Sequence, residues 1–397
     1  MKDKLQSNIW KFYVINLLTG LHFVVPIRIM YLLSFGLSYT QIGLMELGAA
    51  ITIFILEIPS GIFADLVGRK ASRIVAYVFS FSGFALMSIS STAPFFILGW
   101  ALSGAADAFE SGATDALIYD TLKGLGKQEE YAKLKSRLLL ILTTVMIIGS
   151  ITGAYLYVID RRLPWYLFTG IIVLSFLLFL TVIEPKRTSE EKLVSKSIAS
   201  FRQSLVVSLN NREVIELIIF TVLLALPMYL FGSLVSQPYF VSKGFTVSSL
   251  GYIFAFIVGI SGFLASFSHV LDRRLKKKYS LFLIFISFTI LMTLMGIVKT
   301  QYAILFVLGF YFIDSYKNIV MDAYINKLID SESRASVLSV ISFMKNTIAA
   351  VVFVGIGYLV DRYKIDTVLI GMGIAVSLIA IPITVSLNYA KKIHIKT

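Results

Sequence analysis

Long apolar segments recur along the whole chain, and they constrain its fold more than any other feature. The first runs from Ile9 to Ser34 and leads directly into a second. It is longer than the apolar region of a signal peptide and no small-residue cleavage site follows it, so we expect a permanent transmembrane helix. Only 15% of the residues are charged and 57% are hydrophobic, whereas soluble domains carry about 25% charged residues. Because water tolerates little exposed apolar surface, the sequence predicts an integral membrane protein.

The chain length predicts the number of spans, and the hydrophobic pattern predicts their type. At roughly 20 residues per helical crossing, 397 residues are sufficient for about twelve spans. The strict alternation of a transmembrane β-barrel is not found, so we expect an all-α membrane protein. The expected helices cover residues 9–34, 40–64, 72–92, 94–122, 131–159, 164–183, 212–241, 246–271, 279–298, 301–328, 335–360 and 364–390.

The basic residues give the expected topology. If the N-terminus is cytoplasmic, most of the 36 Lys and Arg residues fall in cytoplasmic segments, as the positive-inside rule requires. Both termini are then cytoplasmic, in a multi-pass protein of the cell membrane. The net charge of +13 therefore reflects topology and contact with anionic lipid, and we expect no nucleic-acid partner.

A charged stretch divides the chain almost in half. It begins at Glu184 and ends at Arg212, and we interpret it as a cytoplasmic linker. The expected organisation is a six-helix bundle over 1–184, a linker over 185–211 and a second six-helix bundle over 212–397.

The two halves also share charged positions. An offset of 207 residues superimposes Asp65 on Asp272 and Asp107 on Asp314, and it places Asp322 opposite Asp115. Duplicated halves with a solute site between them near the bilayer midplane are a recurring transporter plan. The sequence therefore predicts two pseudo-symmetric bundles.

A motif follows the second predicted helix, with Gly61, Asp65, Gly68, Arg69 and Lys70 in the spacing G-x-x-x-D-x-x-G-R-K. It resembles the loop 2–3 signature of the major facilitator superfamily, and the resemblance extends over the whole chain. It implies two six-helix bundles that move by alternating access around a central cavity, which the first, fourth, seventh and tenth helices line.

The motif residues suggest a conformational latch. Gly68 permits a turn in which a side chain would clash, and the Arg69 guanidinium can pair with a carboxylate, for which Asp120 is the candidate. The resemblance implies that Asp65, Gly68, Arg69, Lys70 and Asp120 close the cytoplasmic side in one conformation. The alternative is an ordinary basic cytoplasmic loop.

Charged residues within the predicted spans form a second candidate site. A charge at the bilayer centre costs at least about 2.5–3.5 kcal/mol, so it is a functional candidate by default. Asp107 and Glu110 lie one turn apart on the fourth predicted helix, and Asp314 and Lys317 are their counterparts on the tenth. We expect all four to face the cavity and to bind solute or protons. The alternative is a structural network, such as a Glu110–Lys317 ion pair.

Two further charges in the spans have two interpretations each. Glu57 lies two residues before Pro59, which is expected to kink the second helix, so Glu57 is either a protonation site or part of a capped kink. Arg28 either holds an anionic group or pairs with Glu46, and we favour pairing.

The fifth predicted helix carries small residues at Gly149 and Gly153, a pattern that permits close helix approach. The glycine-proline motif that proton-driven drug exporters of the superfamily often carry in this helix is absent, as is their arginine in the fourth helix.

The remaining motifs limit the function. The chain has no cysteine and no phosphate-binding loop or metalloprotease motif, so we expect no cofactor, no metal and no enzymatic activity. Acids outnumber bases in the spans, which favours protons and cationic or neutral solutes. We therefore predict a monomeric secondary transporter that couples proton movement to export of a lipophilic or cationic compound. Two alternatives stay open: a proton symporter for uptake of a sugar or other small metabolite, and a membrane receptor or scaffold without transport.

Overall fold

The computed structural model describes residues 2–185, 212–257, 259–260, 277–328, 331–376 and 378. Within these residues every regular element is a helix, and each of the twelve predicted segments contains helix. In the described part of the chain, eight helical segments are long and apolar enough to cross a membrane. The all-α membrane fold class is confirmed.

Three expectations lie outside the described residues. They concern residues 186–211 of the linker, the motif copy around Asp272 and the side chain of Asp322.

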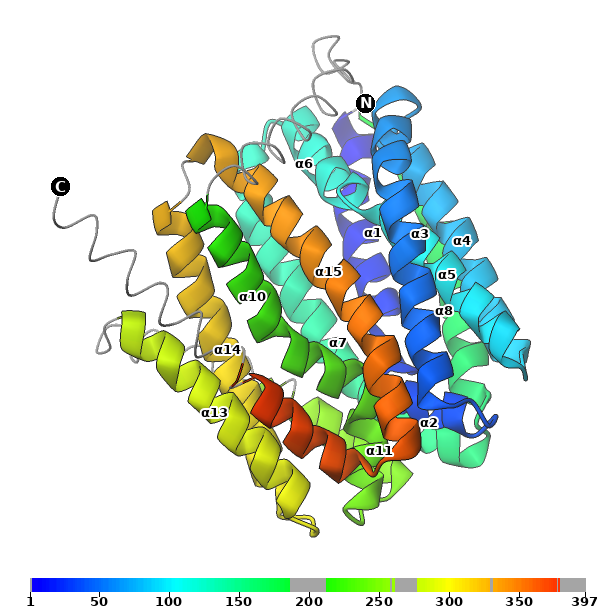
Figure 1. The fold of residues 1–397 in the computed structure, drawn as a ribbon. Coiled ribbons are helices and arrows are strands. Elements are labelled where there is room, and N and C mark those ends of the chain that lie inside the picture. Colours follow the sequence, from blue (N-terminus) through cyan, green and yellow to red (C-terminus); the bar gives the residue numbers. More distant parts are fainter. Residues whose placement is uncertain are drawn as a thin grey trace, which may run out of the picture. The chain divides into compact units, whose positions relative to one another are not determined.

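The chain forms two compact units (Figure 1). The N-unit comprises Met1–Ala199 and Thr246–Phe256, and the C-unit comprises Ser200–Phe245 and Ile257–Thr397. The N-unit contains α1 (Lys2–Gly20), η1 (Val25–Ile27), α2 (Arg28–Leu33), α3 (Tyr39–Leu66), α4 (Arg69–Ile89), α5 (Ala93–Glu110), α6 (Ala113–Leu125), η2 (Gln128–Glu130), α7 (Tyr131–Ile159) and α8 (Leu163–Leu180). The C-unit contains α10 (Arg212–Leu230), the π-helix η4 (Phe231–Val235), α11 (Ser236–Ser242), α13 (Lys277–Ile297), α14 (Ala303–Leu328) and α15 (Ser331–Arg362).

Both units repeat the same local structure. The Tyr31 hydroxyl donates to the carbonyl oxygen of Met87 at 2.8 Å, and the Tyr239 hydroxyl donates to that of Met295 at 2.8 Å. Each residue of the second pair lies 208 positions after its counterpart in the first. The glycines Gly36 and Gly244 are also 208 residues apart and have φ angles of 78° and 92°. Equivalent contacts at one offset support a duplicated chain.

Buried aromatic rings surround these tyrosines and form the core of each unit at that end. In the N-unit the Tyr31 ring lies 4.8 Å from Trp165 and 5.8 Å from Phe96. In the C-unit the Phe231 ring lies 5.5 Å from Tyr239 and 5.7 Å from Phe310.

The first predicted helix, 9–34, is not continuous. Helix α1 ends at Gly20, and α2 begins only at Arg28. Pro26 has no N–H and its ring would clash with the carbonyl group of His22 in an α-helix. In the structure the carbonyl oxygen of His22 accepts instead from the N–H of Val25 at 3.2 Å. Proline therefore explains the break.

Helix α7 accepts this non-helical segment closely. A Cβ atom added to Gly153 would lie 2.0 Å from the carbonyl oxygen of Phe23, and one added to Gly149 would lie 3.1 Å from the amide nitrogen of His22. The prediction that these glycines permit close approach is confirmed. Their partner is the interrupted backbone after α1 rather than a regular helix.

The fourth predicted helix, 94–122, is also interrupted. Helix α5 ends at Glu110 and α6 begins at Ala113. Gly112 has φ of +72°, a left-handed conformation that ends a right-handed helix and that glycine adopts without strain. Asp107 and Glu110 therefore share one helix, whereas Asp115 belongs to the next one and pairs with Lys135 of α7.

The seventh predicted helix, 212–241, remains helical but not uniformly α-helical. Pro227 lies inside α10, and the five residues Phe231–Val235 form a π-helix before α11. Such π-bulges are frequent at functional sites in α-helices.

Replacing Gly153 with alanine should destabilise the protein by about 1–3 kcal/mol, because its methyl group would overlap the Phe23 carbonyl oxygen. Thermal unfolding in detergent measures the effect as a lower midpoint. Gly170→Ala in α8 is the matched control, since no atom lies within 4 Å of the added Cβ, and helix propensity favours alanine there. Equal midpoints for the two variants would contradict the packing assigned to Gly153.

Candidate functional site

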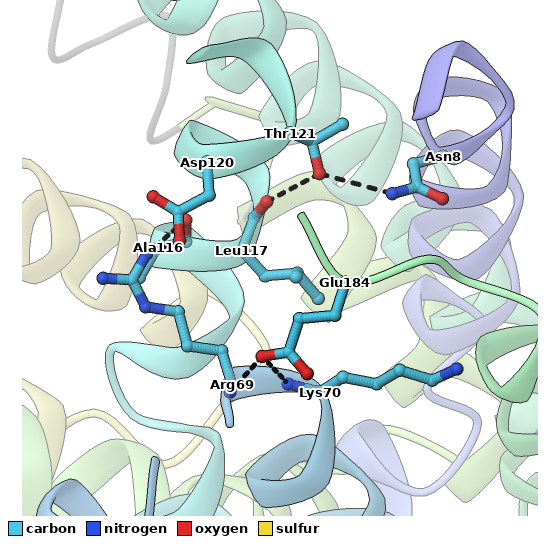
Figure 2. Close-up of polar contacts among 8 residues, drawn as sticks. All are labelled: Asn8, Arg69, Lys70, Ala116, Leu117, Asp120, Thr121 and Glu184. Atoms are coloured by element: carbon cyan, nitrogen blue, oxygen red, sulfur yellow. Dashed lines mark hydrogen bonds and ion pairs between the residues drawn. The ribbon is translucent and has the colours of Figure 1, made fainter. Parts of the chain in front are cut away.

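The motif residues lie where α4 begins (Figure 2). The Oε1 atom of Glu184 accepts hydrogen bonds from the backbone N–H groups of Arg69 at 2.7 Å and Lys70 at 3.3 Å. These are the first two residues of α4, whose N–H groups have no partner within the helix. The carboxylate therefore caps the helix and complements the positive end of its dipole.

Gly68 is required here for two reasons. Its φ of +140° is a conformation that residues with a side chain rarely adopt. In addition, a Cβ at this position would lie 2.8 Å from Oε2 of Glu184. The glycine of the motif thus makes room for the capping carboxylate, a role that the spacing alone does not reveal.

Arg69 connects α4 to α6. Its guanidinium forms an ion pair with Asp120, and Nη1 also donates to the carbonyl oxygen of Ala116 at 2.9 Å. The predicted Arg69–Asp120 contact is confirmed. Asp65 lies half-buried in the last turn of α3, at the same end of the N-unit.

Two lysines at this end bind the C-terminal end of α8. The Lys70 ammonium donates to the carbonyl oxygen of Leu180 at 2.8 Å, and that of Lys11 donates to Thr181 at 2.7 Å. Carbonyl groups at a helix C-terminus lack partners within the helix and attract cations. Lys70 therefore contributes to the cluster through α8 rather than through a carboxylate.

Asn8 forms hydrogen bonds with the backbone of the residue that precedes Glu184. Its amide nitrogen donates to the carbonyl oxygen of Ile183 at 2.7 Å, and its amide oxygen accepts from the N–H of Ile183 at 3.0 Å. The same nitrogen lies 3.3 Å from the hydroxyl oxygen of Thr121 (Figure 2). This pair of hydrogen bonds fixes the backbone that presents Glu184 to α4.

Glu184 is a site residue that the sequence did not predict, because it begins the charged stretch interpreted as a linker. Its only sequence signal is an acidic residue directly before Pro185, where a helix must end. Nothing in the spacing indicates that this carboxylate folds back onto the motif 115 residues earlier.

The acids of α5 have a basic partner in the N-unit. Glu110 forms an ion pair with Arg73, and its pairing with Lys317 stays a prediction. Arg73 falls in the predicted helix 72–92. In the structure it lies in α4, which starts earlier, at Arg69, and it is 8% exposed with its guanidinium 4.5 Å from the Tyr77 ring centroid.

Asp107 lies one turn before Glu110 and is exposed on the N-unit. The charges of Glu110 and Arg73 both act on it. Two carboxylates and one guanidinium thus form a cluster in which one negative charge has no basic counterpart. We call Asp107, Glu110 and Arg73 the α5 acid cluster.

Glu57 does not join this cluster through any contact described here. Its side chain is exposed, and α3 continues through Pro59 without a break. The hydroxyl of Ser60 donates to the carbonyl oxygen of Glu57 at 3.0 Å and to that of Ala108 in α5 at 2.8 Å. This arrangement satisfies backbone groups near the proline, as a capped kink would.

In the C-unit, Asp314 and Lys317 pair with each other on α14. Lys317 is 5% exposed, and a buried ammonium needs such a partner. The corresponding positions of the two units therefore differ, because this pair is neutral and the α5 acid cluster is not.

Arg28 pairs with Glu46, as the favoured interpretation predicted. Trp100 donates from Nε1 to the second oxygen of this carboxylate at 3.2 Å, and the guanidinium lies 4.5 Å from the tryptophan ring centroid. With these contacts Arg28 joins α2 to α3 and α5.

A family model described as the Major Facilitator Superfamily matches residues 13–354. The chain belongs to this superfamily. Among curated proteins, it is 31% identical over 273 residues to the uncharacterized MFS-type transporter YxaM of Bacillus subtilis (strain 168), covering 67% of this chain and 66% of that protein. It is also 22% identical to the quinolone resistance protein NorA of Staphylococcus aureus (strain MSSA476), over 57% of this chain and 56% of NorA.

The fold of this superfamily member resembles that of a solved relative. The crystal structure of the nucleoside transporter NupG superimposes with a TM-score of 0.81 over 95% of this chain and 98% of NupG, at 13% identity. At that identity the likeness concerns the fold alone.

Replacing Glu184 with alanine should destabilise the N-unit by about 1 kcal/mol, because two N–H groups of α4 lose their acceptor. A lower midpoint of thermal unfolding in detergent measures the loss. Glu129→Ala is the matched control, since Glu129 is an exposed acid in η2. If both variants unfold at the wild-type temperature, Glu184 is not a structural cap.

Proposed function

We propose that this protein is a secondary transporter that works by alternating access and couples proton entry to export of a lipophilic or cationic compound. Membership in the superfamily supports the transport mechanism, and the α5 acid cluster supports the coupling of solute transport to protons.

The single observation that carries the coupling is the composition of the α5 acid cluster. Arg73 is buried and pairs with Glu110, so it neutralises one of the two carboxylates. Asp107 remains as an exposed acid within reach of both charges. A carboxylate without a basic counterpart in a membrane segment is costly unless it binds a cation. A proton and a cationic solute group would therefore compete for Asp107.

The break after Glu110 fits this role. Helix α5 ends directly at the cluster and α6 starts after Gly112. Discontinuous helices near charged groups are typical of ion and solute sites in transporters. A change in the charge of the cluster can therefore be transmitted to α6, which carries Asp120 of the latch.

The latch would stabilise one of the two conformations. Arg69–Asp120, the Gly68 turn and the Glu184 cap join α4, α6 and the end of α8. The basic residues at this end favour its placement at the cytoplasmic face. We therefore assign Asp65, Gly68, Arg69, Lys70, Asp120 and Glu184 to a cytoplasmic gate, with both termini on the same side of the cell membrane and the monomer as the transporting unit.

The similarity to NorA favours export as the direction of transport. NorA is a quinolone resistance protein, and resistance to a drug requires that the drug leave the cell or fail to act. This supports a lipophilic substrate and outward transport.

The coupling is tested in proteoliposomes with an imposed pH gradient and a fluorescent lipophilic cation such as ethidium. Asp107→Asn and Glu110→Gln should abolish gradient-driven transport, because neither amide can exchange a proton. Asp115→Asn is the control, since that acid lies beyond the helix break and pairs with Lys135, and its variant should retain most of the activity.

Three results distinguish the alternatives. Full transport by both the Asp107 and the Glu110 variant would remove the acid cluster from the mechanism. Accumulation of solute on the side toward which protons move would identify a symporter. No flux of any solute in well-folded protein would leave only a receptor or scaffold role.

A further inference from the structure

A second polar cluster lies in the C-unit. It consists of Lys345 and Asn346 near the start of the apolar part of α15 and Tyr229 near the end of α10. These two helices pack against each other, and both contact α14. Lys345 falls in the predicted helix 335–360. In the structure its ammonium lies 5.4 Å from the centroid of the Tyr229 ring.

Lys345 carries a charge that its surroundings do not neutralise. Among the described residues no carboxylate forms an ion pair with it. The charges of Lys317 and Asp314 both act on Lys345, but they are opposite and paired with each other, so their effects largely cancel. The tyrosine ring attracts the ammonium only weakly, by about 0.5–2 kcal/mol. One positive charge therefore remains available.

Asn346 adds hydrogen-bond donors beside this charge. Its amide oxygen accepts a hydrogen bond from the Tyr229 hydroxyl at 3.3 Å. The oxygen is therefore oriented toward Tyr229, and the amide NH₂ group, which has two donors, points to a different side. Asn346 is exposed and Lys345 is half-buried, so both groups are accessible from outside the C-unit.

An ammonium and an amide NH₂ next to an aromatic ring suit a carboxylate attached to a flat apolar body. The carboxylate accepts charge-assisted hydrogen bonds, and an aromatic body can pack beside Tyr229, which is 37% accessible. An unneutralised lysine in a membrane segment is costly and marks a solute pathway by default.

We infer that Lys345, Asn346 and Tyr229 form a subsite for the carboxylate of an aromatic solute. This inference rests on the proposed transport function and adds aromatic compounds that carry an acid group to its lipophilic substrates. Lys317 is already paired with Asp314, so Lys345 provides the charge of the subsite.

Equilibrium binding to the purified full chain in detergent tests the subsite. The probe is 2-naphthoate, and 2-naphthamide is its uncharged analogue of the same shape. A bound ligand raises the unfolding midpoint with its concentration. We expect 2-naphthoate to stabilise the wild-type protein with an apparent Kd at least about tenfold lower than that of the amide, since one charged contact is worth about that factor.

The variants distinguish an effect of the charge at position 345 from an effect on folding. Lys345→Gln should weaken 2-naphthoate about tenfold and leave 2-naphthamide unchanged, whereas Lys345→Arg should retain the preference for the acid. Asn346→Asp, which is almost the same size, should repel the carboxylate and provides a second variant if Lys345→Gln does not fold. Lys299→Gln is the control, since Lys299 is 65% exposed and pairs with Asp366 elsewhere in the C-unit.

Equal stabilisation of the wild type by the acid and the amide, or by neither, would overturn the inference. So would an unchanged preference in Lys345→Gln and Asn346→Asp. Stabilisation by dioleoylphosphatidylglycerol that needs Lys345, without any by 2-naphthoate, would assign the charge to a lipid headgroup and also overturn it. If naphthoate binding needs Lys345 but no solute is transported, the proposed function fails and the subsite stands.

Discussion

The structure depends on one constraint: in a bilayer, every backbone N–H and C=O group must find its partner within the protein. Continuous helices meet this requirement by themselves, and their ends do not. In the N-unit the free groups at one end of α4 and α8 are satisfied by Glu184, Lys70 and Lys11. The superfamily motif therefore helps to satisfy the backbone groups at helix ends, in addition to the latch role proposed for its residues.

Breaks within helices create the same requirement inside the membrane. The interruption after α1 is accommodated because Gly149 and Gly153 of α7 allow the backbone to approach. The interruption after α5 is accommodated by the left-handed Gly112. In both cases the break lies close to a charged group, Arg28 in the first and Glu110 in the second. Proline and glycine thus determine where the chain can place charge at membrane depth.

The charges of each unit pair mainly with neighbours in the same unit. Arg28 pairs with Glu46, Arg73 with Glu110, and Lys317 with Asp314. Removing one partner of such a pair leaves a buried charge at high cost, so these pairs hold each unit together as a body. Among the described residues, Asp107 of the N-unit and Lys345 of the C-unit form no ion pair. We propose these two residues as places where a proton or a solute binds.

The sequence alone determined the helical membrane class, the segments that contain helix, the Arg69–Asp120 contact and the role of Gly149 and Gly153. The Arg69–Asp120 contact was indicated by the superfamily motif. The other features follow from composition, from hydrophobic length and from residue types with strong local preferences, which act the same way in any surroundings. Only the tertiary structure decided that Glu184 caps α4, that Arg73 pairs with Glu110, and that Lys345 lies against the ring of Tyr229. Each of these depends on which helices are neighbours and on the rotation of each helix about its axis. A shift of one residue at the start of a helix turns a side chain by about 100°, so spacing along the chain cannot specify such contacts.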